Sequence, residues 1–218
     1  MEFSRHLSGR LLFDKSAASL KSYIRHTPNK AHQEDIEELY DLKRAARLKK
    51  QVDASSEPSL KDLLDLTHLV TGYGRKHQSD ALVYAEKAVT LYPDSVSAIL
   101  LLVKSLPYGQ IQTDRKVSLL NQAAIIEPNN SLVFSTRGWV YFYVRDLRNA
   151  EKDFRRALSS SQNTDSGAWK GLGYALMERG SKRDAISAFR NYLRYHKAST
   201  HDDDEITILI ESLERNPH

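Results

Sequence analysis

The sequence predicts an all-α fold built from stacked helical hairpins, and three observations lead to this prediction. The segments that begin at Ser131 and Ser166 repeat one pattern of glycine, alanine and aromatic residues, offset by 35 residues. Pro93 and Pro128, also 35 residues apart, each follow a run with apolar residues at helical spacing. A fixed internal period of this length is typical of architectures in which each repeat buries its apolar face against the next.

The last two repeats carry the pattern most fully. The fourth has W-x2-L-G followed by A-x3-F, in Trp169, Leu172, Gly173, Ala185 and Phe189, and the third matches its later half in Gly138, Tyr141, Ala150, Phe154 and Ala157. The glycines would let a neighbouring helix approach closely, and the alanines would let the second helix of a hairpin nest against the first. The two phenylalanines are expected to fill the space between hairpins.

This pattern resembles the tetratricopeptide repeat (TPR), a helix–turn–helix unit of 34 residues. Aligned on the shared residues, four repeats begin at Asp62, Ser97, Ser131 and Ser166. The resemblance covers about Ser59 to Lys197 and implies a right-handed α-solenoid whose first helices line a concave groove. The second repeat departs from the pattern at Lys104 and Lys116, where small residues are expected, and at Pro107, which is expected to shorten its first helix.

Residues 1–57 and 201–218 flank the solenoid, which is expected over residues 58–200. Apolar residues at helical spacing predict helices over Ser16–Ile24 and Gln33–Val52, which form either a hairpin that caps the solenoid or an arm that orders on a partner. An amphipathic helix over Asp203–Arg215 is expected to cover the apolar face of the last repeat. The whole chain should contain about eleven helices.

Composition and charge exclude several classes of function. The 32 basic and 28 acidic residues are interspersed and leave a net charge of +4, too mild and too mixed for nucleic acid or an anionic membrane as the main partner. No run approaches the ~20 apolar residues of a membrane helix. Met1–Phe13 is not a signal peptide as it stands, although a chain that had lost a leader would look the same. The absence of cysteine excludes disulfides and thiolate chemistry, and it fits the cytosol, which we favour, and the periplasm alike.

No motif predicts an enzyme, a cofactor or a metal site. The sequence has no Gly-rich phosphate loop and no nucleophile elbow. The acidic run from Asp202 to Glu205 beside His201 matches a metal site in composition only, because it lacks the spacing of calcium and zinc loops. Acidic residues are in any case favoured at the N-terminus of a helix.

By resemblance to the TPR family, fixed positions of each first helix face the groove. The residues expected there to contact a partner are mostly aromatic: Tyr73, Tyr108, Trp139, Phe142, Tyr143, Lys170, Tyr174 and Met177. The positions of the family's carboxylate clamp hold a single cation, which disfavours a clamp; they are Leu66, Val70, Leu101, Ser105 and Lys170. The aromatic residues could instead belong to the core between the helices, where such residues usually pack.

The resemblance implies a non-catalytic protein-binding scaffold, adaptor or chaperone whose groove holds an apolar or amphipathic segment of a partner. In the family such modules serve secretion, pilus, envelope and chaperone assemblies. The alternative is a homo-oligomeric structural subunit whose groove is filled by its own N-terminal helices.

A cluster of basic residues in the third repeat could meet an acidic partner or nucleic acid; it comprises Arg137, Arg145, Arg148, Lys152, Arg155 and Arg156. Acidic residues are interleaved with them at Asp146, Glu151 and Asp153. We therefore favour a solvated helix face with ion pairs between residues four apart.

Overall fold

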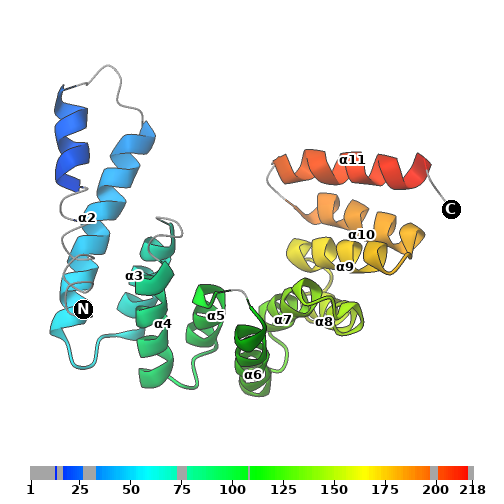
Figure 1. Ribbon diagram of the computed structural model, residues 1–218, viewed down its shortest axis with the longest axis horizontal. Coiled ribbons are helices and arrows are strands. Elements are labelled where there is room, and N and C mark those ends of the chain that lie inside the picture. Colours follow the sequence, from blue (N-terminus) through cyan, green and yellow to red (C-terminus); the bar gives the residue numbers. More distant parts are fainter. Residues whose placement is uncertain are drawn as a thin grey trace. The chain divides into compact units, whose positions relative to one another are not determined.

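The fold is all-α, as predicted. The computed structural model describes residues 13, 17–26, 33–72, 78–107, 109–196 and 201–215, and within these ranges it contains helices and no strand. A helix over residues 17–26 precedes ten further helices, which follow one another along the described chain in Figure 1. These are α2 (Gln33–Ala54), α3 (Leu60–Gly72), α4 (Gln78–Leu91), α5 (Val96–Ser105), α6 (Gln110–Ile126), α7 (Ser131–Tyr143), α8 (Leu147–Ser160), α9 (Ser166–Glu178), α10 (Lys182–Tyr195) and α11 (His201–Arg215). None of the helices in this described part is long and apolar enough to cross a bilayer.

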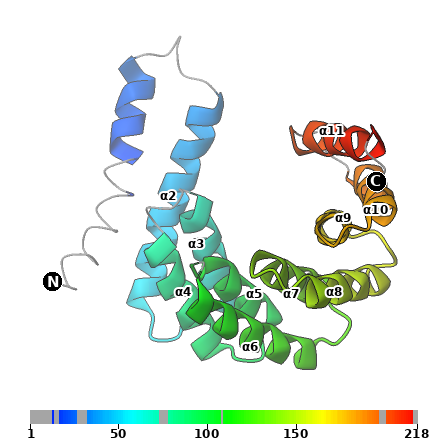
Figure 2. The same ribbon diagram turned by 45° about the vertical axis from the view of Figure 1, so that its right-hand side comes forward.

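The chain forms two compact units, Met1–Ser105 and Leu106–His218, which we call the N-terminal and C-terminal units. In the N-terminal unit, α2 packs on α3, and α3 and α4 pack on each other and on α5. In the C-terminal unit, each helix from α6 to α11 packs on the next, and α7 and α8 lie side by side as a hairpin (Figure 2). Each unit has its own buried core, and no described residue belongs to both cores.

The helix α2 belongs to the core of the N-terminal unit. Its Leu42, Ala45 and Val52 are buried together with Leu63 and Leu66 of α3. Burial of apolar side chains is the main force that holds packed helices together. The N-terminal helical segment is therefore packed on the first repeat along much of α2.

The third and fourth hairpins begin where the sequence predicts. The helices α7 and α9 start at Ser131 and Ser166. The side chains of the preceding Asn130 and Asp165 accept hydrogen bonds from backbone N–H groups in the first turn, at 3.0 and 2.9 Å. Both helices thus begin with a side-chain cap, which satisfies a donor that lacks a partner within the helix.

The second repeat is the irregular one. Its first helix, α5, spans 10 residues, whereas α3, α7 and α9 each span 13. It ends two residues before Pro107, which confirms the predicted shortening. Lys116 on α6 is buried, and burial lowers the pKa of its ammonium group. The boundary between the two compact units falls in this repeat, between Ser105 and Leu106; the divisions near residues 57 and 200 stay predictions.

The two C-terminal hairpins close with the same backbone turn. After α7, Arg145 has φ 66° and the next N–H donates to the carbonyl of Tyr141 at 2.9 Å. After α9, Gly180 has φ 82° and the next N–H donates to the carbonyl of Leu176, also at 2.9 Å. Both are Schellman-type helix ends with a left-handed residue. The two hairpins therefore share this turn, although its left-handed residue is an arginine in one and a glycine in the other.

Glycines make room for two fully buried phenylalanine rings. A Cβ atom on Gly138 would lie 2.7 Å from the ring of Phe154, and one on Gly171 would lie 2.3 Å from the same ring. A Cβ atom on Gly173 would lie 2.4 Å from the ring of Phe189. Phe154 of α8 is thus held between α7 and α9, because neither glycine has a side chain that would occupy the space of the ring.

Candidate functional site

Six of the eight predicted groove residues lie on the first helices of the two C-terminal hairpins. On α7 they are Trp139, Phe142 and Tyr143, and on α9 they are Lys170, Tyr174 and Met177. The other two, Tyr73 and Tyr108, lie outside the described residues.

Four of these residues, Trp139, Phe142, Tyr143 and Tyr174, form one group of rings that we call the Trp139 cluster. The ring centroid of Trp139 lies 5.6 Å from that of Phe142, 5.9 Å from that of Tyr143 and 6.3 Å from that of Tyr174. Phe142 of α7 and Tyr174 of α9 are 6.2 Å apart. These distances are typical of interacting aromatic pairs, so the cluster joins the two hairpins.

The Trp139 cluster is anchored in the core by edge-to-face contacts with the pattern phenylalanines. Trp139 lies 5.4 Å from Phe154, and Tyr174 lies 5.2 Å from Phe189, measured between ring centroids. Sequence reasoning gave core and groove as alternatives for the cluster. Trp139, Phe142 and Tyr174 pack partly against the core, whereas Tyr143 is mostly exposed; that the cluster lines a groove stays a prediction.

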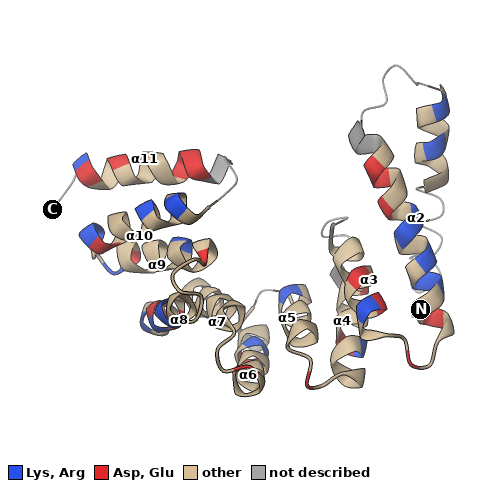
Figure 3. Cartoon of the chain, turned by 180° about the vertical axis from the view of Figure 1, so that it is seen from behind, with Lys and Arg blue, Asp and Glu red and all other residues tan. Residues whose placement is uncertain are grey.

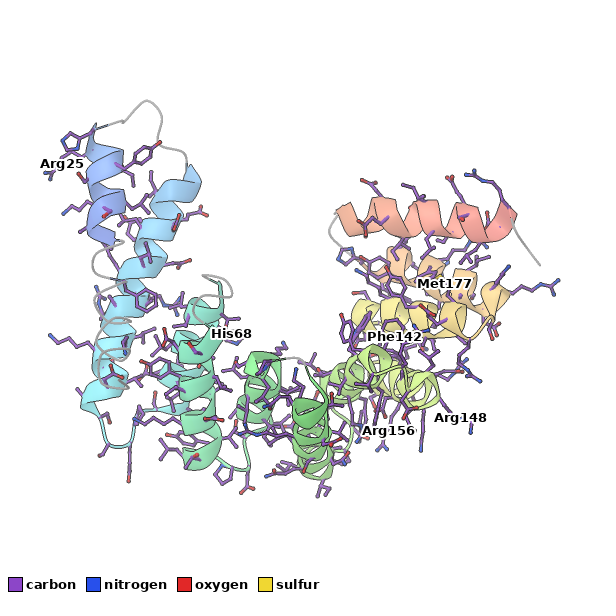
Figure 4. The ribbon with its side chains drawn as sticks, in the orientation of Figure 1. Arg25, His68, Phe142, Arg148, Arg156 and Met177 are labelled. Atoms are coloured by element: carbon purple, nitrogen blue, oxygen red, sulfur yellow. The ribbon has the colours of Figure 1, made fainter. Side chains whose placement is uncertain are left out.

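Exposure rises from the core outward across this surface. Trp139, Phe142, Tyr174 and Met177 are partly buried against the core of the C-terminal unit, and Figure 4 labels Phe142 and Met177. Tyr143 is 60% exposed. A large aromatic side chain that is mostly exposed beside other rings offers apolar area to a partner.

Charged side chains border the Trp139 cluster. The Lys170 Nζ lies 5.6 Å from the ring centroid of Tyr192, within the range of a cation–π contact. Arg145 and Glu178, which follow α7 and end α9, form an exposed ion pair at 2.8 Å. This pair raises the pKa of Arg145 and lowers that of Glu178 through their hydrogen bond. The edge of the cluster is therefore polar, with a neutral ion pair and one further cation, Lys170.

The carboxylate-clamp positions that fall in the N-terminal unit belong to the core. Leu66 and Val70 are fully buried, and Leu101 and Ser105 are 4% and 2% exposed. The Ser105 hydroxyl donates to the carbonyl of Leu101 at 2.9 Å, within its own helix. These four side chains are therefore packing residues.

Two buried ionic groups were not evident from the sequence. Arg137 donates two hydrogen bonds to Asp153, at 2.6 and 2.8 Å, and these raise the pKa of its guanidinium. Lys49 of α2 donates to Tyr84 of α4 at 2.6 Å and to Asp53 at 2.9 Å. Burial acts to lower the pKa of Lys49, but these hydrogen bonds together raise it. The sequence shows that these side chains are charged or phenolic. Which of them pair depends on which helices come into contact.

Arg155 and Glu151 form the expected ion pair four residues apart, at 2.9 Å, and Arg179 of the next repeat joins the same carboxylate. Asp203 of the acidic run lies 2.9 Å from the Nδ1 atom of His196. Within the described ranges no three His, Asp or Glu residues come together as a metal-binding group.

The comparisons with known proteins concern the fold. No protein-family model matches the chain, and no curated protein has a matching sequence. Among solved structures, TTC0263, a thermophilic TPR protein of Thermus thermophilus, matches with a TM-score of 0.61 at 17% identity, over 81% of this chain and 94% of that one. MamA matches with a TM-score of 0.57 at 19% identity, over 69% of this chain and 85% of that one. YrrB, described as a TPR protein with an unusual peptide-binding site, matches with a TM-score of 0.54 at 16% identity, over 79% of this chain and 86% of that one. The repeats, the hairpins that they form and these structural neighbours together show that the chain has the fold of a tetratricopeptide-repeat α-solenoid.

Proposed function

We propose that the protein is a non-catalytic interaction scaffold and that the Trp139 cluster, with Met177 and Lys170 beside it, binds an apolar or amphipathic segment of a partner protein. The observation that carries the proposal is the joining of four aromatic rings from α7 and α9 at the edge of the core, with Tyr143 60% exposed. Buried aromatic anchors supply much of the affinity in protein interfaces. The peptide-binding site reported for YrrB, a structural neighbour, is consistent with such a use of the fold.

The expected ligand is a helix or an extended segment with apolar residues at regular spacing. Aromatic side chains lose little conformational entropy on binding, so an exposed ring beside packed rings is an efficient anchor. The polar edge, Lys170 and the Arg145–Glu178 pair, would contribute to specificity. The remaining predicted contacts, Tyr73 and Tyr108, belong to this proposal only as sequence predictions.

Selection of peptides from a random displayed library on the purified chain tests the proposal directly. We expect the selected peptides to be apolar or aromatic at a helical or alternating spacing. Tyr143→Ala should raise the Kd of such a peptide about 30-fold, as expected for loss of about 2 kcal/mol at a central anchor. Ile125→Ala is the matched control, because Ile125 is 82% exposed on α6 and lies outside the cluster.

The double substitution Trp139→Ala and Phe142→Ala tests whether these two side chains bind a partner or stabilise the core. We expect it to abolish peptide binding while circular dichroism shows nearly unchanged helical content. Unfolding of this variant would mean that the two side chains serve the core, and the Tyr143→Ala result would then decide the site alone. Equal binding by wild type and Tyr143→Ala would overturn the proposed site.

The competing function is a homo-oligomeric structural subunit, with the cluster filled by the chain's own N-terminal helices or by those of a second copy. Analytical ultracentrifugation of the wild type and of Tyr143→Ala distinguishes the two. Self-association that depends on Tyr143 would favour the oligomer, whereas a monomer that binds the selected peptide supports the scaffold. The partner recovered from the native source would then show whether a secretion, pilus or envelope assembly is involved.

A further inference from the structure

The outward face of α8 carries a row of cations. Arg148, Lys152, Arg155 and Arg156 are all exposed and recur at the spacing of one helix face. The last cation stands eight positions after the first, so the row is about 12 Å long. Figure 4 shows Arg148 and Arg156 extending away from the helix, and Figure 3 shows basic residues along α8.

The two carboxylates of α8 neutralise only one member of this row, Arg155. Asp153 is 4% exposed and receives the two hydrogen bonds from Arg137 on the inner side. Glu151 accepts from both Arg155 and Arg179. Within the described ranges no carboxylate pairs with Arg148, Lys152 or Arg156. The face therefore keeps an excess of positive charge.

One of these cations is also held in place. The guanidinium of Arg156 lies 4.1 Å from the ring centroid of the buried Phe134, and it donates to the carbonyl of Pro128 at 3.3 Å. A cation that is positioned before binding loses less entropy when it meets an anion. The outward face of α8 is thus partly preorganised.

In the next hairpin, the residue that corresponds to Arg155 pairs with a carboxylate of the following helix. Arg190 of α10 stands 35 residues after Arg155, at the same place in the repeat. Its guanidinium pairs at 2.6 Å with Glu214 of α11, and His196 at the end of α10 lies 2.9 Å from Asp203 of the same helix. The helix α11 packs on α10 as α9 packs on α8, and these ionic contacts add to the burial of Ile206 and Ile210.

We propose that the outward face of α8 binds an acidic segment of a partner protein, with carboxylates three or four residues apart. None of the exposed residues of α8 is apolar, so the attraction is electrostatic and does not require the Trp139 cluster. This surface is therefore separate from the proposed peptide site. Charge complementarity of this kind mainly sets the association rate and the choice of partner.

Fluorescence anisotropy with labelled poly-L-glutamate as the probe tests this surface in the full chain. We expect binding at low salt that weakens as the ionic strength rises from about 50 to 200 mM. The variant Arg148→Glu/Lys152→Glu should weaken binding about tenfold or more. The matched control is Lys43→Glu/Arg47→Glu on α2, which changes two exposed cations at the same spacing and alters the net charge equally.

The control cations belong to the N-terminal unit and not to the face of α8, so their loss should change the affinity less than about twofold. If the two variants weaken the binding of poly-L-glutamate equally, the loss reflects only the change in net charge, and the proposal is overturned. Absence of binding at low salt would do the same. If Arg148→Glu/Lys152→Glu fails to fold by circular dichroism, Arg148→Gln/Lys152→Gln replaces it, with the same expected direction.

Two further probes distinguish the chemistry of the anion. A single-stranded oligonucleotide and vesicles with anionic lipid present phosphate in place of carboxylate. Poly-L-glutamate should bind at least as tightly as either, and Tyr143→Ala should leave its affinity unchanged. Tighter binding of a phosphate probe, lost in the α8 variant, would overturn the assignment to an acidic polypeptide.

Discussion

At the residue scale, the tightest constraints lie where a glycine faces a phenylalanine ring. Gly138 and Gly171 face the ring of Phe154 from two different helices, and Gly173 faces Phe189. A tightly packed interior cannot take an added methyl group without moving side chains or backbone. These contacts therefore fix how closely α7, α8 and α9 approach one another.

Gly171→Ala should destabilise the protein by about 1 to 3 kcal/mol, because its Cβ would lie 2.3 Å from Phe154. Gly167→Ala on the same helix is the control, since its Cβ would meet nothing closer than 3.4 Å. The control should be neutral or stabilising by up to about 1 kcal/mol, as alanine favours helix over glycine. Urea unfolding followed by circular dichroism measures both. Equal effects of the two substitutions would contradict the packing argument.

Asp65 should make the stability of the N-terminal unit depend on pH. Hydrogen bonding from Lys61, with the charges of Lys61 and Arg44, holds the pKa of Asp65 below its ordinary value of 3.8. Because the folded state favours the ionised carboxylate, this contribution is present above the ordinary pKa and is lost as the pH falls through the folded value. The difference in unfolding free energy between wild type and Asp65→Asn should therefore shrink below about pH 4. A difference that stays constant from neutral to acidic pH would exclude this role.

At the element scale, the repeated turn after α7 and α9 shows how the backbone is conserved between hairpins. The left-handed position is occupied by Arg145 in one turn and by Gly180 in the other. Periodicity placed both hairpins correctly from the sequence, since each helix start follows from residues close in the chain. The left-handed arginine has no local signal of the kind that glycine gives, and only the structure revealed it.

Gly180→Ala should lower the unfolding free energy by about 1 to 2 kcal/mol through backbone strain alone. Its added Cβ would meet nothing within 4 Å, so no steric contact contributes. The reciprocal substitution Arg145→Gly relieves the same strain while it removes the Glu178 partner, so the midpoint of unfolding should not fall. Thermal unfolding of both variants checks the pair. A Gly180→Ala protein as stable as the wild type would show that the turn adapts.

At the scale of the whole molecule, the two compact units have separate cores. The core of the C-terminal unit runs from Phe134 to Ile210, and that of the N-terminal unit from Phe13 to Ala98. The boundary follows the shortened α5 and precedes α6 with its buried Lys116. The repeat that departs most from the pattern is thus the one where the division occurs.

The fragment Leu106–His218 should therefore fold by itself. We expect the fragment to contain the same helices, α6 to α11, as the full chain, and to unfold cooperatively. A shorter fragment from Ser131 should be less stable, because it lacks Leu120 and Ala123 of α6, which are fully buried. Circular dichroism and urea unfolding test both fragments. An unfolded Leu106–His218 fragment would show that its core depends on the N-terminal unit.

The sequence by itself determined the fold class, the starts of the third and fourth hairpins and the shortened α5. These follow from spacing, glycine and proline, whose effects act over a few neighbouring residues. Only the tertiary structure decided that Arg137 pairs with Asp153, that Phe154 lies between Gly138 and Gly171, and that the chain divides at Ser105. It also decided which rings of the Trp139 cluster meet, because such contacts depend on which helix faces come together, and residues far apart in the chain settle that jointly.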